Sequence, residues 1–166
     1  MDTKKVYFDT NIVLDIIDLK RPNHTKAKKI WELLTINKSK IVISEDMLST
    51  IFYINKDDTY TLNFFKLIIK RWFVVPFGKK VIENAIELSL EKHLDLEDLL
   101  QCLCAKENAC DIFITNDKKF YDCEINIMTS DEFLRHSEVL PPSLRGTSPV
   151  IARHFLRHCE ERSNLA

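Results

Sequence analysis

Three aspartates that are far apart in the chain occupy positions where their carboxylates could meet. Asp9 directly follows an apolar run at residues 4–8, Asp117 lies just beyond another run at residues 111–115, and Asp98 stands near the start of an amphipathic segment. In an open parallel sheet, ligand sites form outside the carboxyl ends of the strands. We therefore expect the three carboxylates to converge on one crevice.

Crowded carboxylates raise one another's pKa values and are costly unless a cation neutralises their charge. Oxygen ligands without histidine or cysteine favour Mg²⁺ or Mn²⁺, which can activate water and stabilise a phosphodiester during hydrolysis. Asp9, Asp98 and Asp117 are therefore candidate catalytic residues and candidate metal ligands. A lone aspartate at a helix start is more often an N-cap, and Asp95 fits that interpretation best.

Alternating strands and helices must position these residues. Apolar runs predict strands at residues 4–8, 41–43, 72–76, 111–115 and 125–128. Apolar residues at helical spacing predict helices at residues 10–18, 24–37, 58–70 and 79–92, after Ser44, from Asp95 and from Ser130. Strands that are joined through helices imply right-handed crossovers, so we expect an α/β fold with a parallel sheet covered on both faces.

The composition indicates an ordinary globular domain. A chain of 166 residues with 45% apolar and 30% charged residues is neither disordered nor collagen-like. A net charge of -1 gives no overall electrostatic drive toward nucleic acid, so any basic patch must be local. Neither a signal peptide nor an apolar stretch of about 18 residues is present, so we expect a cytoplasmic protein without membrane contact.

The five cysteines show no CxxC pair and no zinc-ligand spacing, so we expect them to be reduced. Cys102 and Cys104 lie in an apolar helical stretch, where a free cysteine behaves as a small hydrophobic residue. We place one domain at residues 1–138 and a tail outside the core fold at residues 139–166. That tail could be a read-through extension, or it could form a helix at residues 150–161 that contacts a partner.

Three segments together carry a family resemblance: VYFDTNIVLD, DLEDLLQ and IFITNDKKF, at residues 6–15, 95–101 and 112–120. Their order and spacing resemble the three signatures of PIN domains, over about residues 4 to 135. The resemblance implies a three-layer α/β/α PIN-like fold with a five-stranded parallel sheet. It also implies an Mg²⁺- or Mn²⁺-dependent ribonuclease, and many members are the toxins of VapBC-type toxin–antitoxin pairs.

By position in these motifs, the resemblance makes Asp9 the first metal ligand, Asp98 the acid of the EDLLQ helix and Asp117 the acid of TND. It gives supporting roles, in holding the carboxylates or a bound water, to Asn11, Thr115 and Asn116, for which helix and loop capping is the alternative. Many members place a glutamate one turn into the helix after the second strand. This chain has Thr50 there, so the site either binds metal more weakly or uses a neighbouring acid such as Glu97.

The resemblance favours an endoribonuclease toxin that acts on an RNA substrate and is silenced by a small antitoxin protein. A homodimer could form through the aromatic-rich stretch at residues 52–72, although core packing is the favoured explanation of that stretch. The alternative is a catalytically weakened PIN domain that acts as an RNA-binding or protein-interaction module, which Thr50 supports. A Rossmann-type cofactor domain is disfavoured because no glycine-rich loop follows the first strand.

Overall fold

The computed structural model describes residues 4–55 and 58–138. Within these residues, five parallel strands form one sheet in the order β3-β2-β1-β4-β5. The strands are β1 (Lys5–Phe8), β2 (Lys40–Ser44), β3 (Phe73–Val75), β4 (Ile112–Ile114) and β5 (Asn126–Met128). The sequence-based expectation of a five-stranded parallel sheet is confirmed.

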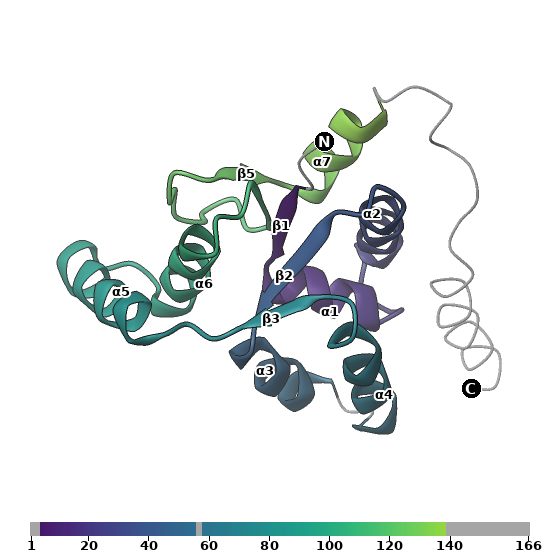
Figure 1. The fold of residues 1–166 in the computed structure, drawn as a ribbon, viewed down its shortest axis with the longest axis horizontal. Coiled ribbons are helices and arrows are strands. Elements are labelled where there is room, and N and C mark those ends of the chain that lie inside the picture. Colours follow the sequence, from purple (N-terminus) through teal and green to yellow (C-terminus); the bar gives the residue numbers. More distant parts are fainter. Residues whose placement is uncertain (1–3, 56–57, 139–166) are drawn as a thin grey trace.

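Helices occupy the connections between the strands. The described helices are α1 (Thr10–Ile17), α2 (His24–Ile36), α3 (Asp46–Ile54), α4 (Asp58–Ile68), α5 (Lys79–Lys92), α6 (Leu96–Glu107) and α7 (Ser130–Glu138). The connections through α1 to α4 run in one direction along the sheet, and the connection through α5 and α6 runs back. Because crossovers are right-handed, α5 and α6 cover the opposite face. Figure 1 shows these two helices on one side of the sheet and α1 and α2 on the other, which confirms three α/β/α layers.

The reversal of direction falls between β1 and β4, which are neighbours in the sheet although β2 and β3 separate them in the sequence. Asp9 follows β1 and Thr115 follows β4, and the Asp9 N–H donates to Ile114 O at 3.0 Å. The residues after these two strands therefore lie side by side at the edge where open parallel sheets form ligand sites.

A continuous core fixes this arrangement. Tyr7 of β1 and Phe113 of β4 stack with their ring centroids 5.0 Å apart, and Phe8 meets Trp72 edge to face at 5.5 Å. The aromatic-rich stretch divides between two environments: Trp72 and Phe64 are buried, whereas Tyr53 is 91% exposed. Core packing thus accounts for only part of that stretch.

The proposed tail at residues 139–166, with its helix at residues 150–161, lies outside the described residues. Among residues 4–55 and 58–138, no helix is both long enough and apolar enough to cross a bilayer.

Candidate functional site

Asp9 is the most buried acid at the carboxyl edge of the sheet, with 5% of its surface exposed. It stands at the N-cap position of α1, yet its carboxylate makes no capping hydrogen bond there. Burial raises the pKa of Asp9 to about 6, although the Thr115 hydroxyl and the nearby N–H groups of Asn11 and Thr10 favour the ionised form. Asp9 therefore carries a charge that its surroundings compensate only in part.

Thr115 connects the two segments that carry Asp9 and Asp117. Its buried Oγ1 donates to Asp9 Oδ2 at 2.8 Å and accepts from the Asp117 N–H at 3.0 Å. Asp117 itself is exposed, and its Oδ1 accepts from the Lys119 N–H at 2.8 Å. The Thr115 hydroxyl thus fixes the Asp9 carboxylate relative to the backbone of Asp117.

Asp98 enters the same site from α6. The helix begins after Asp95, whose Oδ1 accepts from the N–H groups of Glu97 at 2.9 Å and Asp98 at 3.2 Å, so Asp95 is an N-cap as expected. The pKa of Asp98 is raised to about 6, first by burial and then by the negative charges of Asp95, Asp9, Asp117 and Glu97. The three candidate aspartates therefore lie within electrostatic range of one another.

Their side chains are near one another but do not form a closed set of ligands. Among the described residues, no three His, Cys, Asp or Glu side chains are grouped closely enough to hold one metal ion as they stand. The donor set is nevertheless suited to a hard divalent cation, because it consists of carboxylates, and burial and neighbouring negative charges raise the pKa values of Asp9 and Asp98. The Asp9, Asp98 and Asp117 carboxylates are the groups that could hold such an ion.

Gln101 is a site residue that sequence reasoning did not single out. Its buried amide donates from Nε2 to Thr10 Oγ1 at 3.1 Å and to Glu97 Oε1 at 3.4 Å, and its Oε1 accepts from the Thr10 N–H at 3.4 Å. These bonds connect α6 to the start of α1. Its signals in the sequence were its place at the end of the DLEDLLQ motif and a polar amide within an apolar segment.

Asp46 is a second residue near the site that sequence reasoning did not single out. The pKa of Glu97 is raised by burial and by the charges of Asp95 and Asp46, so Asp46 lies near the site from the first turn of α3. Thr50 is four residues further along and lies on the same face of α3. Thr50 is half-buried and makes no side-chain hydrogen bond within the described residues. Thr50 carries no charge, so Asp46 is the residue that supplies a carboxylate on this face of α3.

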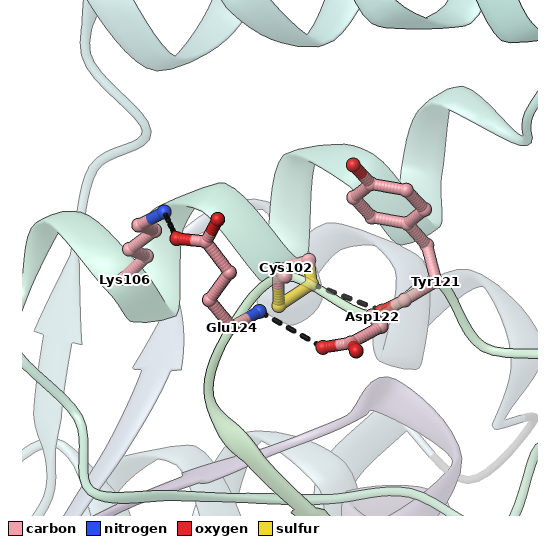
Figure 2. Close-up of a disulfide and its surroundings, with 6 residues drawn as sticks. Cys102, Lys106, Tyr121, Asp122 and Glu124 are labelled. Carbon is pink, nitrogen blue, oxygen red and sulfur yellow. Dashed lines mark hydrogen bonds and ion pairs between the residues drawn. A yellow bond between two sulfur atoms is a disulfide. The ribbon is translucent and has the colours of Figure 1, made fainter.

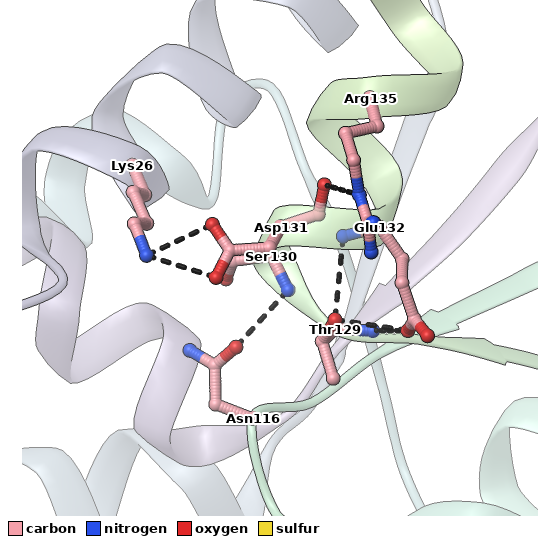
Figure 3. Close-up of polar contacts among 7 residues, drawn as sticks. All are labelled: Lys26, Asn116, Thr129, Ser130, Asp131, Glu132 and Arg135. Atoms are coloured by element: carbon pink, nitrogen blue, oxygen red, sulfur yellow. Dashed lines mark hydrogen bonds and ion pairs between the residues drawn. The ribbon is translucent and has the colours of Figure 1, made fainter.

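The two candidate asparagines bind neighbouring groups other than the site carboxylates. Asn11 Oδ1 accepts from Arg21 Nη2 at 3.1 Å, and Arg21 Nε donates to the buried Asp15 Oδ1 at 2.6 Å. Asn116 Oδ1 accepts from the Ser130 N–H at 3.0 Å, at the start of α7 (Figure 3). Both contacts are of the capping and positioning kind.

A disulfide joins Cys102 to Cys123, with the two Cα atoms 5.9 Å apart (Figure 2). The expectation that all cysteines are reduced is therefore wrong for this pair, whereas Cys104 and Cys110 are free and buried. Cys102 lies four residues after Asp98 on α6, and Cys123 lies in the connection that follows Asp117. The disulfide thus joins the two segments that carry these aspartates.

Comparison with known proteins agrees with the fold. The PIN domain model matches residues 6–126. Ribonuclease VapC1 of Aquifex aeolicus (strain VF5) is 35% identical over 137 residues, which cover 80% of this chain and 95% of that protein. The chain therefore belongs to the PIN domain family.

Solved structures show the same fold at lower identity. VapBC2 from Rickettsia felis, bound to a DNA fragment from its promoter, matches with a TM-score of 0.59 at 19% identity, over 75% of this chain and 98% of that chain. Mycobacterium tuberculosis VapC20, a toxin that cleaves the sarcin–ricin loop, matches with a TM-score of 0.57 at 13% identity, over 69% of this chain and 92% of that chain.

Proposed function

We propose that this protein is a metal-dependent endoribonuclease, and that it is the toxin of a toxin–antitoxin pair. The observation that supports the proposal is that Asp98 lies within electrostatic range of Asp9 and Asp117 where the strand order reverses, with the pKa values of Asp9 and Asp98 both raised to about 6. The relationship to Ribonuclease VapC1 supports RNA as the substrate.

The three carboxylates have distinct roles in this proposal. Asp9 is the fixed ligand, because Thr115 holds it and burial shields it from water. Asp98 and Asp117 are more exposed and can adjust to the ion and to a phosphate oxygen. When bound, Mg²⁺ or Mn²⁺ would activate water and stabilise the charge on the phosphodiester. Thr115 and Gln101 position the acids, and Asp46 and Glu97 add negative charge at the side where Thr50 stands.

The partner of such a toxin is a small antitoxin protein, as in the toxin–antitoxin complexes of similar fold from Rickettsia felis and Klebsiella pneumoniae. Exposed apolar side chains support a protein partner or a homodimer. Tyr53 of α3 is 91% exposed and Leu90 of α5 is 73% exposed, and apolar surface of this kind is often covered in an assembly. We place the protein in the cytoplasm, where its RNA substrate is found.

Cleavage of a structured RNA by the purified chain in the presence of Mn²⁺ tests the proposed activity. We expect Asp9→Asn to lower kcat/KM by at least about 100-fold, because the substitution removes the buried ligand. Asp58→Asn is the matched control, since Asp58 is an exposed acid in the first turn of α4. Residual cleavage that is equal in both variants would show that the activity belongs to a contaminant.

A weakened PIN domain that binds RNA or protein without cleaving it is the second candidate. Thr50 in place of an acid supports it, as does the open arrangement of the three aspartates among the described residues. Wild-type protein that binds RNA but leaves it intact with either Mg²⁺ or Mn²⁺ would favour this candidate. Metal-dependent cleavage that Asp9→Asn abolishes would exclude it.

A further inference from the structure

A cavity of about 850 Å³ adjoins the catalytic edge on the side of β5. Its walls include Thr115, Asn116 and Asp117 after β4, together with residues at the starts of α2 and α7. A second cavity of about 530 Å³ lies beside it and shares Asp131 and Arg135 of α7 as lining residues. We infer that the larger cavity is a subsite for one nucleotide of single-stranded RNA next to the bond that is cleaved. This inference rests on the proposed ribonuclease function.

Two cationic side chains in the wall are available to phosphate. Arg135 makes one side-chain hydrogen bond within the described residues, from Nε to Asp131 O at 3.4 Å, so its Nη groups have no protein partner there (Figure 3). Lys118 follows Asp117 directly, is exposed, and has no side-chain partner in the described part of the chain. A guanidinium with free Nη groups and a lysine ammonium are the donors that most often hold RNA phosphates.

The wall holds four acids: Asp117, which is a candidate metal ligand, Asp122, whose Oδ1 accepts from the Glu124 N–H at 2.9 Å, and Asp131 and Glu132 of α7. Lys26 forms an ion pair with Asp131 at 2.8 Å, and Glu132 accepts from Thr129 N–H at 2.8 Å and from its Oγ1 at 2.9 Å (Figure 3). Glu132 also lies in the first turn of α7, where the helix dipole stabilises its charge. These carboxylates therefore oppose a phosphate less than free ones would, and their remaining lone pairs can accept hydrogen bonds from ribose hydroxyls.

The N-terminus of α2, which is the positive end of the helix dipole, also lies at this cavity. Asn23, the N-cap of this 13-residue helix, lines the cavity and makes no capping hydrogen bond with its side chain. The first turn of α2 also holds no acidic residue. The N–H groups of that turn are therefore not neutralised by a side chain and can attract an anion.

The remaining wall suits a nucleobase. Phe120, Ile125 and Ile127 give an apolar surface, and the Phe120 ring is held against Phe113 at a centroid distance of 4.6 Å. Asn116 adds a donor, because its Oδ1 is bound to Ser130 N–H while its buried Nδ2 has no partner among the described residues. An unpaired buried donor is costly, and an acceptor on a bound nucleotide would relieve that cost. The cavity therefore combines phosphate, ribose and base contacts beside Asp117.

Fluorescence anisotropy with a labelled single-stranded RNA of about 10 nucleotides tests the subsite. The measurements use the full chain carrying Asp9→Asn, so that the RNA is not cleaved. We expect Arg135→Gln and Lys118→Gln each to raise Kd by about 3- to 10-fold. Each should also reduce the slope of log Kd against log salt by about 0.7, as expected for the loss of one phosphate contact. Arg71→Gln is the control, because Arg71 is exposed and lies before β3, at the other edge of the sheet.

The outcomes separate the subsite from the proposed function. Cleavage by the wild type, with Kd and salt slope in both variants equal to those of Arg71→Gln, overturns the subsite and leaves the ribonuclease standing. Weaker binding by the variants without cleavage by the wild type supports the cavity as an RNA site and overturns the nuclease. Equal affinity for DNA of the same sequence contradicts the role given to the ribose hydroxyls. Lys118 lies in a loop, so Lys118→Gln remains informative even if Arg135→Gln unfolds α7.

Discussion

Thr115 Oγ1 donates to Asp9 Oδ2 at 2.8 Å, and the same oxygen accepts from the Asp117 N–H at 3.0 Å. A single buried hydroxyl therefore fixes the relative positions of two candidate metal ligands that are 108 residues apart in the sequence, since 117 − 9 = 108. Thr115 directly follows β4, so it connects the sheet to the site residues.

Thr115→Val should separate positioning from packing, because it keeps the shape of the side chain and removes the hydroxyl. We expect it to lower the free energy of unfolding by about 1 to 2 kcal/mol, since the buried Asp9 carboxylate loses its donor. It should also raise the pKa of Asp9 further and reduce kcat more than it changes KM. Urea unfolding and RNA cleavage measure these effects. Thr115→Ser keeps the hydroxyl, so failure of this variant to restore most of the activity would contradict the positioning role.

The stability of the metal-free protein should depend on pH through Asp9 and Asp98. Their folded-state pKa values of about 6 exceed the unfolded value of about 4. The folded state therefore binds more protons between these values, and stability rises as the pH falls from about 7 to about 5. Thermal unfolding in the presence of EDTA measures this dependence.

The same reasoning makes Asp9→Asn a stabilising substitution. At pH 7 it should raise the free energy of unfolding of the metal-free protein by about 1 kcal/mol and flatten the pH dependence, because no buried charge remains at residue 9. The exposed Asp58→Asn should do neither. A lower stability of Asp9→Asn at pH 7 would show that the Asp9 charge is fully compensated in the fold.

The disulfide should stabilise the site segments as well as the fold. It closes a loop with a sequence separation of 21 residues, for which chain entropy suggests about 3 kcal/mol. We expect Cys123→Ser, or reduction by dithiothreitol, to lower the free energy of unfolding by a comparable amount and to weaken Mn²⁺ binding. Cys110→Ser replaces a free cysteine and serves as control. If dithiothreitol lowers the free energy of unfolding of Cys123→Ser as much as that of the wild type, the effect of dithiothreitol does not arise from this disulfide.

The face of α3 that carries Asp46 and Thr50 offers a gain-of-charge test. Thr50→Glu should tighten Mn²⁺ binding several-fold, because it adds an acid on the face of α3 that carries Asp46, and should lower the stability of the metal-free protein by about 1 kcal/mol. Titration calorimetry measures the affinity. Ser49→Glu adds the same charge at an exposed neighbouring position. An equal gain in affinity from Ser49→Glu would mean that the face of the helix is irrelevant.

The sequence predicted the fold well because its strands are short apolar runs between amphipathic helices. Asp9 and Thr115 could be assigned to strand ends from these runs alone. The order of the strands could not be derived, because periodicity does not state which strands pair. The expected strand at residues 72–76 is shorter in the structure, where β3 spans Phe73–Val75 at the edge of the sheet with one neighbour.

Contacts between segments distant in the sequence account for what was missed at the site. Gln101 resembles a helix residue of no special kind until Thr10 is placed opposite it. Asp46 resembles an ordinary first-turn acid until α3 and α6 are brought together. Cys102 pairs with Cys123, 21 residues away, and no spacing pattern in the sequence predicts this pair. Each of these roles depends on tertiary packing, which local sequence patterns do not encode.

Anomalous diffraction from crystals soaked in Mn²⁺ is the most direct test of the metal-dependent ribonuclease. We expect a manganese peak bound by carboxylate oxygens of Asp9, Asp98 and Asp117, with the peak lost in Asp9→Asn. Manganese that binds elsewhere, or no peak among these three residues at millimolar concentrations of the ion, would contradict the assignment of the site.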